Sequence, residues 1–333
     1  MTNSSAESTA FHSSHGAGRR FFDAIGAQNL SLLAALAILV AIFGWFQTDI
    51  FFQPRNLTNI LNAVAILGLI ASAQTIVIIA GAIDISVGSI VGVAGVAAAM
   101  ALLATDSPGL GIAAAVIVGT ICGLVNGLLV TKGRVNPIIA TLATMAIFRG
   151  VAYVLSNGRG IGIVNPDYNW IGSGRLIGIP IAVFVFLAVA AVLVYFMRST
   201  DIGRNIYAIG GNPTAAKLVG IKVQKYQIGV YVLTGFVCGI AAVLLTARTT
   251  SGQPASGSEG LELESITAAF LGGCAMAGGK GTIIGTILGV LIIGTLNNGM
   301  ILMQVPTFYQ LVAKGLLLLG AVMLMEFRTA RRD

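Results

Sequence analysis

Long apolar runs follow one another along almost the whole chain, and they limit its possible folds more than any other feature. Most of them are about 17 to 22 residues long, which is the length of a helix that crosses about 30 Å of hydrocarbon. Hydrophobic residues make up 56% and charged residues 9% of the chain, against roughly 45–50% and 25% in soluble domains. Helices satisfy their own backbone hydrogen bonds in lipid. The sequence therefore predicts an all-α integral membrane protein.

Hydropathy predicts a polytopic helical bundle of about ten transmembrane helices. The predicted spans are 30–47, 60–80, 86–104, 110–130, 136–156, 179–197, 226–247, 264–277, 282–303 and 308–326. They form a transmembrane domain over 30–327, preceded by a flexible cytoplasmic tail over 1–29 and followed by a short cytoplasmic tail over 328–333. The first span is long for the core of a signal peptide and lacks a small-residue cleavage site, so we expect it to remain as a helix.

Basic residues are distributed unequally between the two sides of the predicted bundle. With the N-terminus inside, thirteen lysines and arginines flank the inner ends of the spans and four flank the outer ends, while Arg149 and Lys314 lie within spans. The positive-inside rule favours this orientation, so both termini are expected in the cytoplasm. The net charge of +7 then requires no nucleic-acid partner.

Cysteine, histidine and carboxylate residues give no pattern of metal binding or catalysis. Cys122, Cys238 and Cys274 lie in or beside apolar spans without disulfide or metal spacing, and His12 and His15 lie in the N-terminal tail. The spans contain no Ser-His pair, HExxH motif or paired carboxylates. We therefore predict a chain that is not an enzyme and holds no cofactor or metal.

Glycines spaced four residues apart favour close packing between helices in lipid. With 43 glycines in the chain, single pairs at this spacing are expected by chance, and only two triples are informative. These are Gly119, Gly123 and Gly127, and Gly281, Gly285 and Gly289. They indicate a tight bundle and say nothing about a substrate.

One charge-dense segment, 198–226, interrupts the apolar runs. Within it, Asn212 can cap a helix, Pro213 suits the first helical position, and Gly220 supplies a left-handed stop. A short helix continuing over 214–219 is therefore predicted at the inner surface. An exposed, rigid element of this kind suits a channel that is moved by a separate motor. The alternative is an ordinary solvated connector.

The polar segment GAIDISVGS places an acid close to two apolar spans. An unpaired charge in the membrane costs a few kcal/mol, so the carboxylate needs partners. We expect Asp84 or Ser86 to cap the third span by accepting backbone N–H groups from that helix. The alternative is a direct role in gating or in the pathway.

Two further polar segments lie in or beside predicted spans. Arg149 lies deep within 136–156, where it is expected to reach the interface or to pair with a carbonyl; the alternative is an arginine that faces the lumen and binds a polyhydroxylated solute. The segment LGGCAMAGGKGT resembles a phosphate loop, but that loop requires glycine at Cys274 and Ser or Thr at Gly281. It is therefore predicted to be a tight inner turn.

Four segments taken together resemble the permease subunit of bacterial ABC sugar importers, in the ribose, xylose, arabinose and autoinducer-2 branch. They are GAIDISVGS, PIIATLATMAIFRG, GGNPTAAKLVGI and SITAAFLGGCAMAGGKGTIIGTILGVLIIGTLNNG. The similarity runs from about residue 56 to residue 326. The resemblance implies half of a pore in the bacterial inner membrane, paired with a second permease copy or a close paralogue. It also implies a cytoplasmic subunit that binds ATP and Mg²⁺, and a periplasmic sugar-binding protein.

In that family the segment similar to GGNPTAAKLVGI is the coupling helix, which sits in a cleft of the ATPase. The resemblance implies that the contact with the ATPase subunit consists of Arg204, Asn212, Pro213, Ala215, Ala216, Lys217 and Gly220. The small side chains of Ala215 and Ala216 would allow close approach. A bulky acid in place of Ala216 is expected to uncouple ATP hydrolysis from uptake.

The function predicted is import of a monosaccharide or a similar small polyol by alternating access. Candidate pathway or gating residues are polar groups in or beside the spans: Asp84, Ser86, Asn126, Thr141, Arg149, Asn297 and Asn298. For the amides and the threonine, hydrogen bonds between helices are the alternative. The competing function is an ion-coupled secondary transporter of a small neutral solute. Such carriers commonly place acids or histidines within the bundle, whereas predicted spans five to ten hold acids only at their ends, Glu264 and Glu326.

Overall fold

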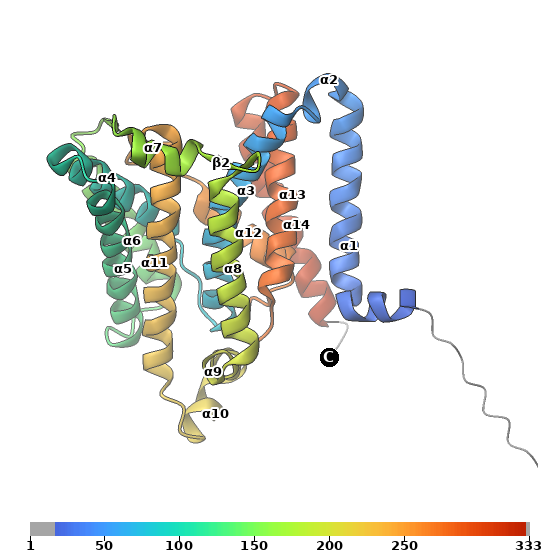
Figure 1. Cartoon of the computed structure of the whole chain (residues 1–333). Helices are drawn as coiled ribbons and strands as arrows, with labels where there is room; N and C mark the ends of the chain where they lie inside the picture. Colours follow the sequence, from blue (N-terminus) through green and yellow to red (C-terminus); the bar gives the residue numbers. More distant parts are fainter. Residues whose placement is uncertain (1–16, 331–333) are drawn as a thin grey trace, which may run out of the picture.

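The computed structural model describes residues 17–330 and, within them, the side chains of residues 29–323. Nearly all of the described chain is helical (Figure 1). The helices are α1 (Ala17–Phe46), α2 (Thr48–Phe51), α3 (Pro54–Ile79), α4 (Val87–Thr105), α5 (Pro108–Thr131), α6 (Pro137–Leu155), α7 (Pro166–Ser173), α8 (Ile181–Ser199), α9 (Asp201–Gly211), α10 (Pro213–Leu218), α11 (Val223–Thr249), α12 (Leu261–Leu271), α13 (Ile283–Leu302) and α14 (Thr307–Ala330). The strands are β1 (Ile161–Gly162), β2 (Arg175–Leu176), β3 (Ile179–Pro180) and β4 (Ser251–Gly252).

Among the described residues, eight helices are long and apolar enough to cross a membrane. They are α1, α3, α4, α5, α6, α8, α11 and α13. A shorter apolar stretch, Thr307–Met323, lies in α14. The prediction of a polytopic all-α bundle is therefore confirmed.

The eighth predicted span, 264–277, is not a continuous membrane helix. Its helix α12 has 11 residues and is about 16 Å long, well short of about 30 Å of hydrocarbon. The helix stops because Gly273, just past its end, has φ of 94°, and the N–H of Cys274 turns back to the carbonyl oxygen of Ala269 at 3.0 Å. The expected turn is thus present at 272–282, but it begins where the span was predicted to continue.

The connecting segments lie at two opposite ends of the bundle (Figure 1). At the end that carries α7, strand β1 pairs with β4, and the Asn165 side chain donates to the backbone oxygen of Asp106 at 2.9 Å. At the end that carries α9 and α10, Gly279 N–H donates to Ile79 O at 2.9 Å. The chain between β4 and Gly279 therefore crosses the bundle, with α12 as the helical part of the crossing.

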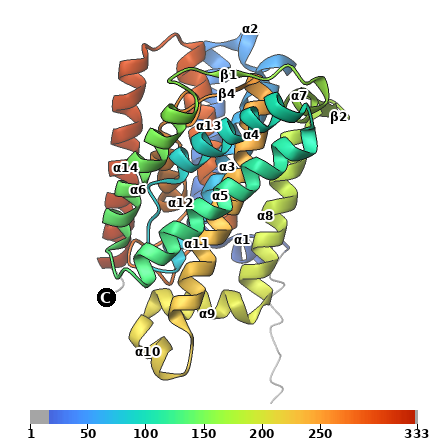
Figure 2. The ribbon, with the colours of Figure 1, turned by 90° about the vertical axis from the view of Figure 1, so that its left-hand side faces the viewer.

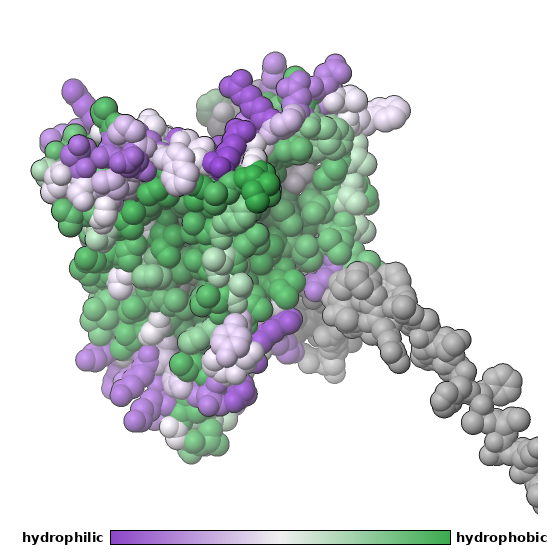
Figure 3. Space-filling view, in the orientation of Figure 1, coloured by the Kyte–Doolittle hydropathy of each residue, from purple (hydrophilic) through white to green (hydrophobic). Residues whose placement is uncertain are grey.

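The surface has the layering of a membrane protein. A hydrophobic band runs across the middle of the visible face, and polar side chains gather at the α7 end and at the α9–α10 end (Figure 3). Helix α1 begins and α14 ends at the α9–α10 end (Figure 1). This arrangement agrees with an even number of crossings.

Helix α3 forms the centre of the bundle, and it packs against α8, α11, α12 and α13. Apolar side chains are buried along most of its length, including Leu69, Ile70, Ile76 and Ile78. A helix that is hydrophobic on every side is stable only where other apolar groups surround it. In Figure 2, α3 lies behind α4 and α5.

The first glycine triple and Gly289 of the second lie where two helices meet, whereas Gly281 lies in the turn before α13. A Cβ atom added at Gly119 or Gly123 of α5 would overlap the backbone of α11 at Gly235 or Tyr231. A Cβ atom added at Gly289 of α13 would overlap the backbone of α12. The prediction of close helix packing is confirmed, since backbones approach this closely only without side chains between them.

Several predicted boundaries differ from those observed. Helix α1 begins at Ala17, so the second half of the predicted tail 1–29 is helical, whereas His12 and His15 lie outside the described residues. Helix α14 continues to Ala330, into the segment predicted as the C-terminal tail. The sequence analysis also missed α7, α9 and the two strand pairs, whose elements are too short for a hydropathy window.

Candidate functional site

The loop that follows α8 folds as the sequence predicted at its three key residues. The Asn212 side chain accepts the backbone N–H of Ala215 at 2.9 Å and caps α10. Pro213 occupies the first turn of that helix. Gly220 has φ of 88°, a left-handed conformation that terminates helices at low cost.

The exposed surface of α10 differs from the predicted contact. Ala216 is only 4% exposed, because the chain folds back so that the Ile221 N–H donates to its carbonyl at 3.1 Å. Ala216 is therefore an internal packing residue of this loop, and its contact with the ATPase subunit remains a prediction. Leu218 and Val219, which the sequence analysis treated only as part of a helix, are 84% and 78% exposed. The sequence does contain a signal for this exposed apolar pair, since two consecutive apolar residues stand directly before the helix-ending glycine.

Helix α9 is amphipathic and lies beside α10. The Thr200 hydroxyl caps it by accepting the N–H of Gly203 at 3.3 Å. Ile206 and Ile209 are buried against the bundle, whereas Arg204 is exposed and forms an ion pair with Asp201. Arg204 thus lies on the outward side, as a contact residue requires.

A junction of glycines joins α9 to the transmembrane helices. A Cβ atom at Gly210 would overlap the carbonyl of Ile79 at the end of α3 and would lie 2.5 Å from the N–H nitrogen of Gly279. The Tyr207 hydroxyl donates to Gly281 O at 2.9 Å. Burial raises the pKa of the Tyr207 hydroxyl, so it remains a donor at neutral pH. Helix α9 is therefore fixed both to α3 and to the turn before α13.

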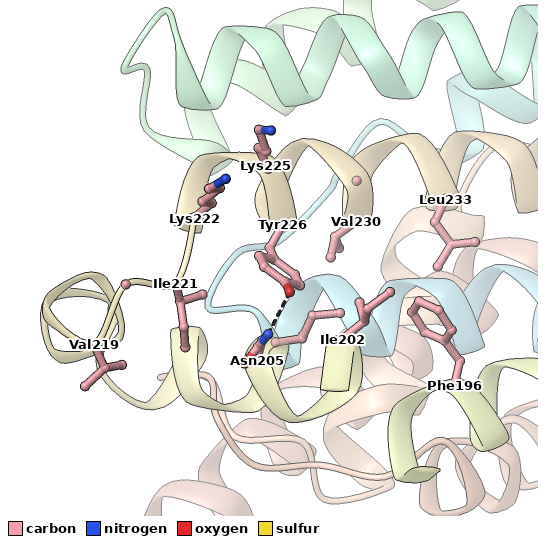
Figure 4. A pocket seen from close by; sticks show the side chains of 13 residues that line it. Phe196, Ile202, Asn205, Val219, Ile221, Lys222, Lys225, Tyr226, Val230 and Leu233 are labelled. Atoms are coloured by element: carbon pink, nitrogen blue, oxygen red, sulfur yellow. Dashed lines mark hydrogen bonds between the residues drawn. The ribbon is translucent and has the colours of Figure 1, made fainter. Parts of the chain in front are cut away.

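On its other side, α9 is separated from α11 by a cleft of about 670 Å³ (Figure 4). Apolar side chains line the cleft, among them Phe196, Ile202 and Leu233. The Asn205 side chain donates to the Tyr226 hydroxyl at 2.6 Å across it. The contact of α9 with α11 is thus looser than its contact with α3.

The Asp84 carboxylate lies fully buried in the segment between α3 and α4. It accepts the backbone N–H of Ser86 at 2.8 Å and the Ser86 hydroxyl at 2.7 Å. The Asn126 side chain in α5 donates to Ser86 Oγ at 2.7 Å and to Asp84 Oδ2 at 3.3 Å. Three of the candidate residues therefore form one network.

Neither Asp84 nor Ser86 accepts a backbone N–H from within α4, so the predicted side-chain cap is wrong. Ser86 is the N-cap residue of α4, but its side chain makes no capping hydrogen bond. The carboxylate accepts the N–H of Ser86 itself, so it stabilises the turn before the helix. Thr141 lies at the edge of this region, with its hydroxyl 2.8 Å from Pro137 O and 3.4 Å from Ile83 O.

Arg149 has the carbonyl partner that the sequence analysis expected. Its Nη1 donates to Pro254 O at 3.2 Å and to Ser258 Oγ at 3.1 Å. Both partners belong to the segment between β4 and α12. Glu262 in α12 is also buried, and its Oε2 has no hydrogen-bond partner among the described residues. The sequence analysis missed Glu262 because its burial depends on α4 packing over it.

The two adjacent amides of α13 make different contacts. Asn298 and Asn56 form a reciprocal amide pair, with N to O distances of 2.8 and 3.1 Å, which joins α13 to α3. Asn297 donates to Glu264 Oε1 at 3.2 Å. Lys314 Nζ lies 2.7 Å from the same oxygen. Both amides thus bond α13 to another helix, and Asn297 also belongs to a charged cluster that the sequence analysis did not foresee.

The described residues offer no set of three or more His, Cys, Asp or Glu side chains arranged for a metal ion. Cys122, Cys238 and Cys274 are free and buried. Among the described residues, the candidate site therefore consists of hydrogen-bonding groups within a helical bundle and one protruding loop.

Residues 56–324 match the family described as branched-chain amino acid transport system / permease component. The chain belongs to this permease family. The permease is 42% identical over 314 residues to the ribose import permease protein RbsC of Bacillus subtilis, covering 94% of this chain and 97% of that protein.

Two other relatives carry the names of different sugars. The L-arabinose ABC transporter permease protein AraH of Azospirillum brasilense is 41% identical, over 85% of this chain and 83% of its own length. The D-allose transport system permease protein AlsC of Escherichia coli is 39% identical, over 87% and 89%. These matches confirm the prediction of a permease subunit of the ABC sugar-importer kind, a transport component rather than an enzyme. They give no support to the ion-coupled alternative.

Proposed function

We propose that this permease carries a monosaccharide or similar small polyol across the bacterial inner membrane by alternating access, with the free energy supplied by a separate ATPase subunit. The names of the relatives support the sugar class. The permease itself would alternate between two conformations of one helical bundle. Its described residues carry no catalytic set, so the partner supplies the free energy. ATP and Mg²⁺ bind to the partner subunit.

The observation that carries this proposal is the rigid attachment of α9 to two transmembrane helices. Gly210 packs on the carbonyl of Ile79 and on Gly279 without room for a side chain. Ile79 ends α3 and leads into the Asp84 segment, while Gly279 lies in the turn that joins α12 to α13. A displacement of α9 would therefore also move the segment between α3 and α4 and the turn between α12 and α13.

The contact with the ATPase is the outward surface of α9 and α10. Leu218 and Val219 expose apolar side chains there. Burying these side chains in a cleft of the partner would remove apolar surface from water and so favour association. The polar and small residues around them are Arg204, Asn212, Pro213, Ala215, Lys217 and Gly220. The buried Ala216 side chain packs inside the loop and stabilises its conformation.

Two further partners complete the assembly. A second copy of the permease or a close paralogue forms the other half of the pore, and a periplasmic binding protein delivers the sugar to the α7 end. With this orientation both termini lie in the cytoplasm, and the basic residues of the α9–α10 loop lie inside, in accord with the positive-inside rule.

Reconstitution tests this proposal. The permease is co-purified with a candidate ATPase subunit and a candidate sugar-binding protein, and ATP hydrolysis is measured in liposomes with ribose, arabinose or allose. We expect one sugar-loaded binding protein to stimulate hydrolysis over the unloaded protein. Failure of the permease to bind the ATPase would contradict the proposal.

A further inference from the structure

A second cavity, of about 550 Å³, lies between α12, α13 and α14. The segment 255–260 and the first residues of α14 form one side of it. That segment follows β4, which belongs to the α7 end of the bundle. The cavity is therefore on the side of the molecule opposite the α9–α10 loop, and under the proposed orientation it faces the periplasmic half of the membrane.

An ion pair lies on the wall of this cavity. Lys314 of α14 and Glu264 of α12 are 2.7 Å apart, and their side chains are 34% and 14% exposed. Both residues line the cavity. Charged groups within a transmembrane bundle are costly unless they face a polar cavity or each other. Here they pair with each other, and both also line the cavity.

The cluster offers complementary hydrogen-bonding groups to a neutral ligand. Glu264 supplies acceptor oxygens, Lys314 supplies donors, and Asn297 contributes an amide whose Oδ1 has no partner among the described residues. The opposite charges of the pair cancel, which favours an uncharged solute. Leucines at 263, 296 and 318 provide an apolar wall, and the volume is within the range of small-molecule sites.

We propose that this cavity is a transient binding site for a monosaccharide within the permease, occupied after release from the binding protein. Glu264 and Asn297 hydrogen-bond the hydroxyl groups, Lys314 donates to a hydroxyl oxygen, and the leucines pack against the C–H face of the ring. This inference rests on the proposed function and extends it, because the permease then takes part in selecting the sugar.

The test uses the complete importer in liposomes, with Glu264→Gln and Lys314→Met variants. We expect the concentration of sugar-loaded binding protein that gives half-maximal uptake, or the ratio of uptake between two sugars, to change by about tenfold, the size expected for hydrogen bonds to charged groups. ATP hydrolysis stimulated by the binding protein should stay within about twofold of wild type, because the motor contact is at the other end of the bundle.

Two controls separate sugar binding from a role in holding helices together. The exchanged pair, Glu264→Lys with Lys314→Glu, retains an ion pair but reverses the groups offered to the sugar; full uptake with unchanged preference would overturn the inference. Asn56→Leu breaks the α3–α13 amide pair outside this cavity, so it should lower thermal stability and leave sugar preference unchanged.

The outcomes also distinguish this inference from the proposed function. If wild-type importer shows ATP-dependent uptake while both single variants keep wild-type half-saturation and sugar preference, the binding site is refuted and the importer assignment stands. If the wild-type assembly shows no ATP-dependent uptake of any sugar, the proposed function itself fails.

Discussion

Gly279 donates its backbone N–H to the carbonyl oxygen of Ile79 at 2.9 Å, which ties the turn before α13 to the end of α3. Gly210 of α9 lies against both groups. Since all of these contacts involve backbone atoms or a missing side chain, no rotamer change can absorb a movement of α9. The loop and the two transmembrane connections should therefore move as one unit.

Replacing Gly210 by alanine should separate α9 from this junction. The added Cβ atom would overlap backbone atoms on two elements, and overpacking of this kind costs about 1–3 kcal/mol. We expect a lower melting temperature in detergent and a marked loss of sugar uptake. Gly211→Ala is the matched control, because a Cβ atom there meets nothing within 4 Å. Equal behaviour of the two variants would contradict the rigid junction.

Leu218→Glu should weaken assembly with the ATPase subunit. The substitution places a charge at a side chain that is 84% exposed, so the permease itself should fold normally, while a desolvated contact is lost at a cost of about 2 kcal/mol or more. This corresponds to a decrease in affinity of at least tenfold, measured by co-purification over a range of ATPase concentrations.

Val164→Glu is the control for this experiment, since Val164 is 88% exposed at the α7 end. It should leave ATPase binding unchanged. Wild-type affinity in the Leu218 variant would exclude the tip of α10 from the contact.

Asn126→Ala should destabilise the segment before α4. The change leaves Asp84 and Ser86 without their partner from α5, and an unsatisfied buried polar group costs about 1–3 kcal/mol. A double-mutant cycle with Ser86→Ala, followed by thermal unfolding in detergent, measures the coupling. Because both residues belong to one network, their effects should not add; additive effects would show that the network is not cooperative.

Gly123→Leu should disrupt the contact between α5 and α11. The side chain would enter the α11 backbone at Tyr231, so the variant is expected to aggregate or to melt well below wild type. Gly150→Leu in α6 meets open space and should retain wild-type stability. A wild-type melting temperature for the Gly123→Leu variant would contradict tight packing between α5 and α11.

The sequence predicted the parts of this fold that depend on local chemistry. Span length follows from hydrocarbon thickness, which identified the long helices. Asn212, Pro213 and Gly220 act within one turn of their own helix, so their roles could be predicted without the tertiary structure. Gly119, Gly123 and Gly127 also identified the closely packed helices α5 and α11, since their spacing alone places them on one face of a helix.

What the sequence could not predict depends on distant contacts. The Glu264–Lys314 pair joins residues on two helices separated by a third element, so neither residue indicates the other. The burial of Ala216 and the exposure of Leu218 depend on how the loop folds back after Gly220. The short length of α12 was hidden because the apolar composition continues into the turn that follows it.

The most direct test of the central claim measures accumulation of a labelled monosaccharide in proteoliposomes. The permease is reconstituted with and without its ATPase, the binding protein is supplied on the side of the α7 end, and ATP is supplied on the side of α9 and α10. The account predicts accumulation against a concentration gradient only when the ATPase and ATP are both present. Accumulation by the permease alone, driven by a proton or sodium gradient, would contradict it.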